Sequence, residues 1–209
     1  MESTPSSSAR FASPDVGQRR TFGLPRAPSE YLASPGPTLD KFRSALNARW
    51  QLRNCNHVGR WTRLSGRAIV LNRGGYISIG ERVLLFFDYI PSIFAVFQGG
   101  RLEIGDRTSI NYGADFAVTG LVKIGEDCGI GTHVIVMDND FHEIGDRSRR
   151  PEPKPVVIGN RVWLANRSTI LPGVTIGDDA IIGAGSVVMT DIPERSLAMG
   201  NPARVIKKL

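Results

Sequence analysis

The hydrophobic positions in the C-terminal half of the chain recur every six residues. Ile, Leu or Val occupies each sixth position from Ile158 to Val188, and an Ile-Gly-acid/amide triplet opens at Ile158 and again eighteen residues later at Ile176. An α-helix repeats at about 3.6 residues and a half-buried strand at two, so neither explains this spacing. A fixed longer period indicates a solenoid with three short strands per turn, in which successive turns pair as parallel strands. The sequence therefore predicts an all-β solenoid.

Three earlier triplets, at Ile79, Ile104 and Ile124, extend the repeat towards the N-terminus, but their spacing is uneven. Ile124 and Ile158 are 34 residues apart, sixteen more than one turn of eighteen needs. The excess predicts an extruded loop over about 137–155. Long insertions without secondary structure in a compact fold are usually functional, so this loop is a candidate site.

The N-terminal third has a different composition. Residues 1–37 are rich in Ser, Pro and Arg without periodicity, and we expect them to be disordered. From Thr38, a plausible N-cap, Leu39, Phe42 and Leu46 recur at helical spacing and predict a short helix to about Leu52. We expect this helix to shield the open end of the solenoid. The predicted organisation is a tail over 1–37, a helix and capping segment over 38–68, a β-helix over 69–193 and a C-terminal tail over 194–209.

The overall composition limits the expected partners and the expected location of the protein. The net charge is +6, but no nucleic-acid-binding motif accompanies it, so nucleic acid is not an expected partner. Two cysteines form no disulfide framework, and we expect Cys128 to be buried packing. The sequence shows no signal peptide and no apolar run long enough to cross a bilayer, so we expect a cytoplasmic protein. Peripheral contact with the inner face of a membrane, or with a lipid-linked glycan, stays open.

The repeats closely resemble those of hexapeptide-repeat acyltransferases, and in particular the sugar and polysaccharide O-acetyltransferases. The segments that carry the resemblance begin at Ile158, Leu171 and Ile182, and the likeness covers about two-thirds of the chain, from Ile69 to Leu209. The resemblance implies a left-handed parallel β-helix, a homotrimer and an acetyl-CoA co-substrate. The hand of the coil follows from the family and not from the spacing.

His142, in the predicted loop, is the expected general base. A histidine flanked by carboxylates suits this role because an acid can fix its tautomer, and His142 matches the loop histidine of the similar acetyltransferases. Asp138 and Asp140 are the candidates to orient it, and the sequence does not decide between them, although we prefer Asp138. Asn111 matches an asparagine that helps to hold the acceptor sugar, although a corner amide that satisfies backbone groups is the alternative.

The resemblance also implies a donor site. Trp163 matches a tryptophan near the thioester, and the small residues that correspond to the donor-binding coils are Ala165, Gly183, Ala184 and Gly185. Near the C-terminus, Asn201 lies in the segment beside the cofactor, and Arg204 and Lys207 match residues that meet its phosphates. The chain departs from the family at Met189-Thr190, where Thr-Lys is usual, so one phosphate-binding lysine is missing.

These expectations imply an acetyl-CoA-dependent O-acetyltransferase that modifies a sugar hydroxyl of a cell-surface polysaccharide or its precursor. An N-acetyltransferase of an amino sugar and a non-catalytic β-helix scaffold are the alternatives. A zinc carbonic anhydrase of the same fold is disfavoured, because His133 and His142 are nine residues apart and no third histidine lies near them. No metal is expected.

Overall fold

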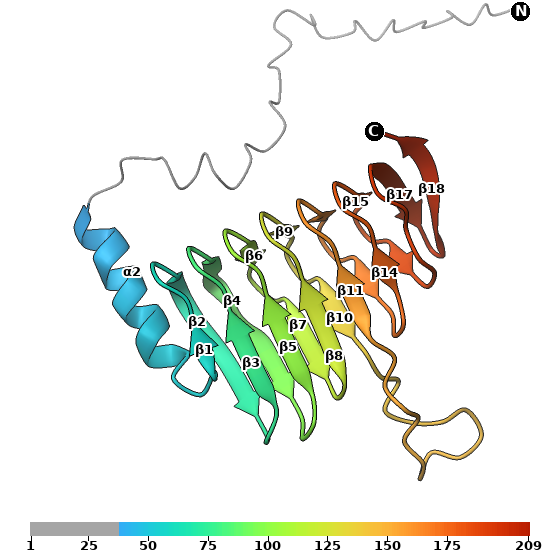
Figure 1. The fold of residues 1–209 in the computed structure, drawn as a ribbon, viewed down its shortest axis with the longest axis horizontal. Coiled ribbons are helices and arrows are strands. Elements are labelled where there is room, and N and C mark those ends of the chain that lie inside the picture. Colours follow the sequence, from blue (N-terminus) through green and yellow to red (C-terminus); the bar gives the residue numbers. More distant parts are fainter. Residues whose placement is uncertain (1–37) are drawn as a thin grey trace, which may run out of the picture.

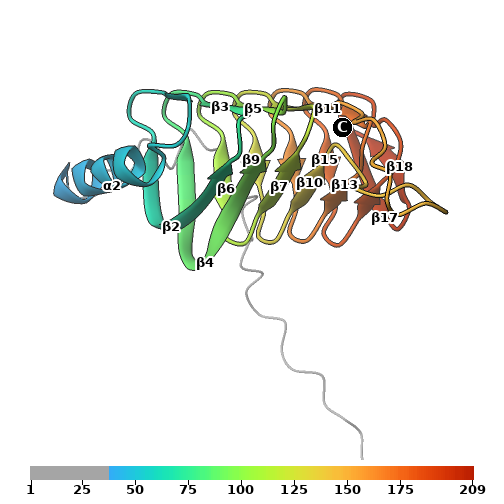
Figure 2. The ribbon, with the colours of Figure 1, turned by 90° about the horizontal axis from the view of Figure 1, so that it is seen from below.

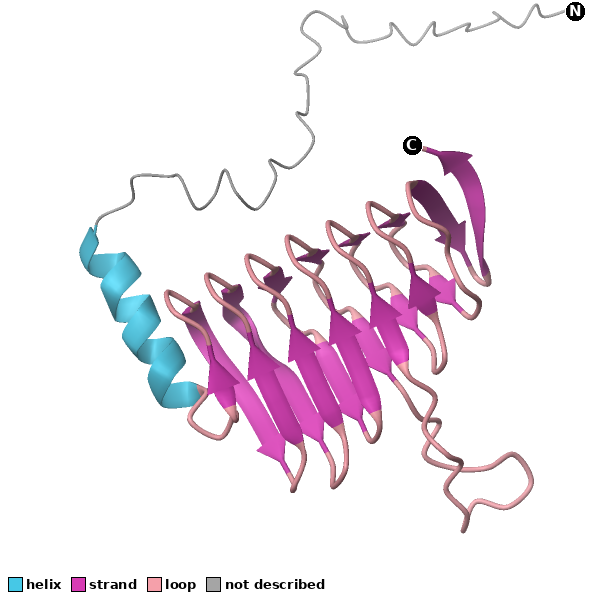
Figure 3. Cartoon of the chain, viewed as in Figure 1, coloured by secondary structure: helices cyan, strands magenta, loops and turns pink. Residues whose placement is uncertain are grey.

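A computed structural model describes residues 38–209, and residues 1–37, where we expected disorder, lie outside the described part. The described chain begins with a helix, α2 (Thr38–Gln51), and continues as a coil of short strands that advances along one axis (Figure 1). Each turn of the coil contributes one strand to each of three faces, and Figure 3 shows the strands stacked turn on turn. The prediction of a solenoid preceded by one short helix is confirmed.

The first face is a six-stranded parallel sheet. Its strands are β1 (His57–Val58), β3 (Tyr76–Ile79), β5 (Arg101–Ile104), β8 (Leu121–Ile124), β11 (Val156–Ile158) and β14 (Thr175–Ile176). Each Ile that opens a triplet ends a strand of this face and pairs with the corresponding Ile of the next turn, from Ile79 to Ile176. All five are buried, so this column forms one wall of the core.

The other two faces share two long strands, β2 (Arg63–Asn72) and β4 (Leu84–Val96), which run from one face onto the next (Figure 2). The second face continues with β6 (Ser109–Asn111), β9 (Gly129–Ile130), β12 (Trp163–Leu164), β15 (Ile181–Ile182) and β17 (Ser196–Gly200). The third face continues with β7 (Asp115–Val118), β10 (Ile135–Met137), β13 (Thr169–Ile170) and β16 (Val187–Val188).

Glycine follows the triplet isoleucines because successive turns approach closely there. A Cβ on Gly125 would lie 2.5 Å from the carbonyl oxygen of Gly159 in the next turn, which no side chain allows. Inside the coil, stacked rings of Phe94 and Phe116, 5.4 Å apart, fill the wider early turns. The regular spacing of the turns sets the corners on which the functional residues lie.

Both ends of the coil are covered. The α2 helix covers the N-terminal edge with a polar face, because Asn47 donates to the Leu64 carbonyl and Gln51 both donates to Gly66 and accepts from the Ala68 amide. The apolar positions that predicted the helix point away from the coil. At the other end, where the sequence indicated a tail, β17 pairs with the antiparallel strand β18 (Ala203–Lys208).

Candidate active site at the loop and corners of the coil

Residues 138–155 leave the coil between β10 and β11 at the corner that joins the third face to the first (Figure 1). Asp138, fully buried, anchors the start of this loop: its carboxylate accepts hydrogen bonds from the amides of Thr119 and Gly120, at 2.9 and 2.6 Å, and from the Thr119 hydroxyl. Its carbonyl oxygen accepts from the amide of Lys154 at 2.8 Å. One residue therefore ties both ends of the loop to the preceding turn.

The next residue sets the path of the loop. The buried side chain of Asn139 donates to the Pro151 carbonyl at 2.7 Å and accepts from the amide of Phe141. Phe141 has a φ of +61°, a left-handed conformation that a bulky side chain adopts only where surrounding contacts impose it. These contacts fix the direction in which Phe141 and His142 leave the coil.

His142 is exposed on the loop, and its Nδ1 lies 2.9 Å from the carbonyl oxygen of Arg147. A carbonyl oxygen can only accept, so this hydrogen bond requires the proton on Nδ1 and leaves Nε2 with its lone pair. A neutral imidazole in this tautomer presents Nε2 as a base. A loop carbonyl, which no side-chain pattern could indicate, therefore orients the ring.

The structure places the two acids proposed to orient His142 differently from that expectation. The carboxylate of Asp138 is directed to Thr119 and Gly120, so the preference for Asp138 as the partner of the imidazole is corrected: it anchors the loop. Asp140 lies exposed on the loop. The preference failed because sequence proximity between Asp138 and His142 does not show which way a buried carboxylate points.

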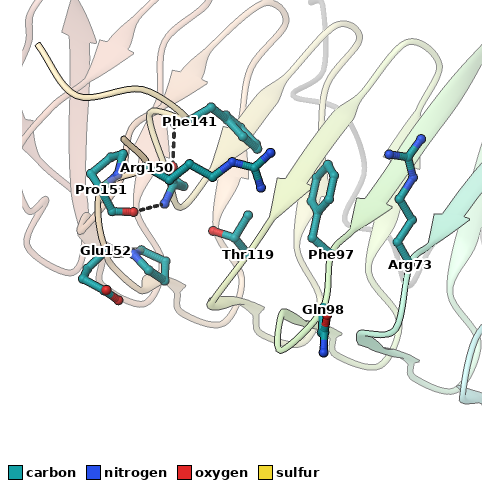
Figure 4. A pocket seen from close by; sticks show the side chains of 10 residues that line it. Arg73, Phe97, Gln98, Thr119, Phe141, Arg150, Pro151 and Glu152 are labelled. Atoms are coloured by element: carbon teal, nitrogen blue, oxygen red, sulfur yellow. Dashed lines mark hydrogen bonds between the residues drawn. The ribbon is translucent and has the colours of Figure 1, made fainter. Parts of the chain in front are cut away.

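A pocket of about 360 Å³ lies at the base of the loop (Figure 4). Arg73 stacks over the ring of Phe97 at 5.7 Å, and that ring meets Phe141 edge-on at 5.8 Å. Figure 4 shows Arg73 and Arg150 on either side of Phe97, and Arg150 comes from the loop. The lining is completed by Gln98, Thr119, Asn139, Pro151, Glu152 and Pro153. Sequence analysis did not identify this pocket, because its residues come from three turns and the loop.

Asn111 lies at the opposite corner, between the second and third faces, and its amide donates to the Ile130 carbonyl at 3.1 Å. The same corner in later turns is formed by Ala165 and Gly183, as the pairing of β6, β9, β12 and β15 shows. The sequence-predicted acceptor residue and donor residues therefore share one column. His133, also on this corner, packs its ring against Tyr112 and Gly113.

The residues predicted to bind the donor form a surface of small side chains bounded by Trp163. The half-exposed indole packs over Gly129 of the preceding turn, with Cδ1 3.6 Å from the position of a Cβ there. At Gly185, where φ is +69°, a Cβ would meet nothing within 4 Å, so the surface is open. Asn201, Arg204 and Lys207 are exposed around the terminal hairpin. This arrangement fits a flat pantetheine arm with basic residues at its phosphate end.

One chain does not bring all these residues together. His142 follows β10 at the end of the third face, whereas Asn111 and Trp163 belong to the second face and its corner. The third face separates the two groups. Within residues 38–209, no group of three or more His, Cys, Asp and Glu side chains could hold a metal ion.

Known proteins resemble this chain along most of its length. A sequence model of the family "Bacterial transferase hexapeptide (six repeats)" matches residues 155–189. The putative lipopolysaccharide biosynthesis O-acetyl transferase WbbJ of Escherichia coli K12 is 31% identical over 177 residues, which cover 79% of this chain and 85% of that protein. The chain belongs to the hexapeptide-repeat acetyltransferases. The expected family is confirmed, and the coil is a left-handed β-helix.

Solved structures of acyltransferases share the fold. The polysialic-acid-specific acetyltransferase NeuO is 28% identical, with a TM-score of 0.54 over 73% of this chain and 63% of that one. A mutant of AntD, an N-acyltransferase from Bacillus cereus in complex with dTDP and coenzyme A, is 23% identical, with a TM-score of 0.63 over 77% and 87% of the two chains. The same fold thus occurs in a polysialic-acid-specific acetyltransferase and in an N-acyltransferase.

None of the helices in the described part of the hexapeptide acetyltransferase is long and apolar enough to cross a membrane.

Proposed function

We propose that this acetyltransferase transfers an acetyl group from acetyl-CoA to a sugar hydroxyl of a cell-surface polysaccharide or its precursor, with His142 as the general base. The observation that carries the proposal is the hydrogen bond from His142 Nδ1 to the Arg147 carbonyl, which leaves Nε2 free. The histidine stands on a loop that Asp138 and Asn139 hold by buried hydrogen bonds. A base held in one tautomer on an anchored loop is suited to proton abstraction.

The proposed reaction is a direct transfer. Nε2 of neutral His142 takes the proton of the acceptor hydroxyl while that oxygen attacks the thioester carbonyl carbon. A backbone N–H stabilises the tetrahedral oxyanion. The carbon–sulfur bond then breaks, and the thiolate leaves and takes the proton from the imidazolium. The products are the acetyl ester and the free thiol, and the histidine returns to its neutral form.

The donor site is proposed on the column of Ala165, Gly183, Ala184 and Gly185, beside Trp163. Small residues let a pantetheine arm lie against the backbone, and Arg204 and Lys207 would meet the phosphates. Asn201 borders this position on the turn between β17 and β18. WbbJ, which resembles this chain over most of both lengths, is named as an O-acetyltransferase of lipopolysaccharide biosynthesis, and this supports the proposed acceptor class.

We propose a homotrimer in which the site lies between subunits. His142 lies at the far end of the third face from Asn111, so a neighbouring coil is needed to place the loop against the donor column. The loop of one subunit would then face Trp163 of the next. The proposed acceptor subsite is the pocket between Arg73, Phe97 and the loop, because it opens beside Phe141, the residue that precedes the base.

Acetylation of an amino sugar is the second candidate. The same Nε2 could take a proton from an amine, and AntD shows that this fold also occurs in an N-acyltransferase. The two candidates differ in the acceptor and not in the donor site. The third alternative, a non-catalytic scaffold, is disfavoured because the relatives of this chain are acetyltransferases.

Calorimetric titration with acetyl-CoA tests the proposal first. Saturable binding near one equivalent per chain, followed by thiol release with sugar acceptors, is the expected result. Acetylation of hydroxyl-bearing sugars that lack an amine would decide for O-transfer, and turnover confined to amino sugars would decide for N-transfer. No binding at millimolar acetyl-CoA would contradict an enzymatic role.

A further inference from the structure

The outward face of α2 carries a stripe of large apolar side chains. Leu39, Phe42, Leu46 and Trp50 are 69, 54, 55 and 68% exposed, and their spacing of three or four residues places them on one side of the helix. The opposite side, with Ala48, packs on the coil. The helix therefore packs on the coil with the face that carries Asn47, Ala48 and Gln51, and presents its strongly apolar face outwards. We call these four residues the α2 stripe.

The α2 stripe lies in the most basic part of the chain. Residues 38–67 contain seven basic and one acidic side chain, a net charge of +6 that equals the formal charge of the whole protein. Arg43 and Arg49 lie on either side of the stripe on a wheel of about 100° per residue. The guanidinium of Arg53 stands over the ring of Trp50 at 5.2 Å from its centroid. Apolar and cationic side chains thus share this part of the chain. The α2 helix lies at the N-terminal end of the coil (Figure 1).

The combination of apolar and cationic side chains indicates which kind of partner could cover the α2 stripe. A second copy of the same face would bring two strongly positive segments together, which electrostatic repulsion opposes. Nucleic acid would use the arginines but not four exposed Leu, Phe and Trp side chains. An anionic bilayer uses both, because Trp, Phe and Leu enter the boundary of the acyl chains while arginines meet the headgroups.

We propose that the α2 stripe lies in the headgroup region of an anionic phospholipid membrane and docks the enzyme there. The helix lies flat at the interface, and Arg43, Arg49 and Arg53 contact lipid phosphates. The loop that carries His142 projects from another part of the coil (Figures 1 and 2), so docking leaves it uncovered by the helix. The inference concerns the N-terminal cap and does not depend on the acceptor or on the catalytic role of His142.

Co-sedimentation with lipid vesicles tests the docking. The full chain is expected to bind vesicles of phosphatidylcholine with phosphatidylglycerol, to bind pure phosphatidylcholine at least about tenfold more weakly, and to be released as salt approaches about 1 M. A Phe42→Gln/Trp50→Gln variant is expected to lose binding about tenfold or more. The matched control is Tyr89→Gln/Ile144→Gln, which removes two exposed apolar side chains elsewhere and should bind like the wild type.

Fluorescence gives a second readout that does not depend on sedimentation. With Trp61→Phe and Trp163→Phe, Trp50 is the single tryptophan, and its emission should shift to the blue with anionic vesicles. Equal binding of the helix variant and its control would overturn the proposal, as would no binding of the wild type. A smaller oligomer for the helix variant would assign the stripe to contacts between copies. Binding of DNA or RNA that requires the arginines but not Phe42 and Trp50 would assign the surface to nucleic acid. Each of these results would reject docking on a membrane.

Discussion

His142 and Arg147 are joined through the backbone: the imidazole Nδ1 lies 2.9 Å from the carbonyl oxygen of Arg147, five residues later in the same loop. The contact depends on the path of the loop and not on the side chain of Arg147. It leaves Nε2 as the basic nitrogen. The catalytic proposal therefore makes separate predictions for the base and for the residues that anchor its loop.

Replacement of His142 by Ala should lower kcat by roughly 10²–10⁴-fold, the contribution of a general base. The midpoint of thermal unfolding should stay the same, because the side chain is exposed and outside the core. Thiol release with acetyl-CoA and an acceptor gives the rate. His57→Ala, at an exposed position on β1, is the matched control and should keep full activity. Near-normal turnover of the His142 variant would reject the mechanism.

Asp138→Asn should destabilise the loop. An amide presents an N–H group where the carboxylate now accepts from backbone amides, so at least one buried hydrogen bond is lost, at a cost of about 1–3 kcal/mol. Hydrogen exchange over residues 138–155 should become faster, and activity should fall with it. Asp140→Asn provides the comparison, because Asp140 is exposed and its loss should leave exchange in the loop unchanged. Unchanged exchange in the Asp138 variant would contradict its role as an anchor.

Trp163→Ala should raise the KM for acetyl-CoA with a smaller effect on kcat. The indole borders the small-residue column, and its loss removes an apolar wall without disturbing the buried Leu164 beside it. Steady-state kinetics at varied donor concentration separates the two parameters. Trp61→Ala, which removes an indole from an exposed corner near the N-terminal cap, should leave the KM for the donor unchanged.

Mixed trimers test whether the site lies between subunits. Trimers made only of His142→Ala subunits, or only of Trp163→Ala subunits, should have little activity at low donor concentration. In a cyclic trimer every interface takes the loop from one subunit and Trp163 from its neighbour. In equal random mixtures made by co-expression, each of these two parts is intact in half of the cases, so about a quarter of the interfaces should have both. Activity should recover to about that fraction. No recovery in verified mixed trimers would place the complete site within one chain.

The repeat predicted the coil because each isoleucine of the triplets both ends a strand and fills the core. The same spacing in the sequence therefore reflects strand pairing and core packing. The helix was predicted from Leu39, Phe42 and Leu46, but its packing was not, since Asn47 and Gln51 make the contacts to the edge of β2. The sequence was enough to propose His142 as the base, and this role stays a prediction. Its partner is a backbone carbonyl, and the pocket beside it joins Arg73 to Arg150, so no local pattern could indicate either one.

The two cysteines provide a pH-dependent measure of packing. Burial raises the pKa of the Cys128 thiol to about 11 and that of Cys55 to about 12, from a usual value near 9. Both thiols are therefore neutral in the folded protein at pH 9–10, while the unfolded chain has begun to lose their protons. The stability that they contribute is fully present below about pH 9 and is lost as the pH rises towards 11.

The expected result is that the free energy of unfolding falls between pH 8.5 and 10.5 more steeply in the wild type than in Cys55→Ala/Cys128→Ala, since lysines and tyrosines that also titrate there are common to both. Chemical unfolding at a series of pH values measures the difference. In the native protein at pH 8, both thiols should also react slowly with an aromatic disulfide reagent and react at once after unfolding, because the thiolate is the reactive form. Fast reaction of the native protein, or parallel pH curves for the two proteins, would show that these thiols are not held neutral by the core.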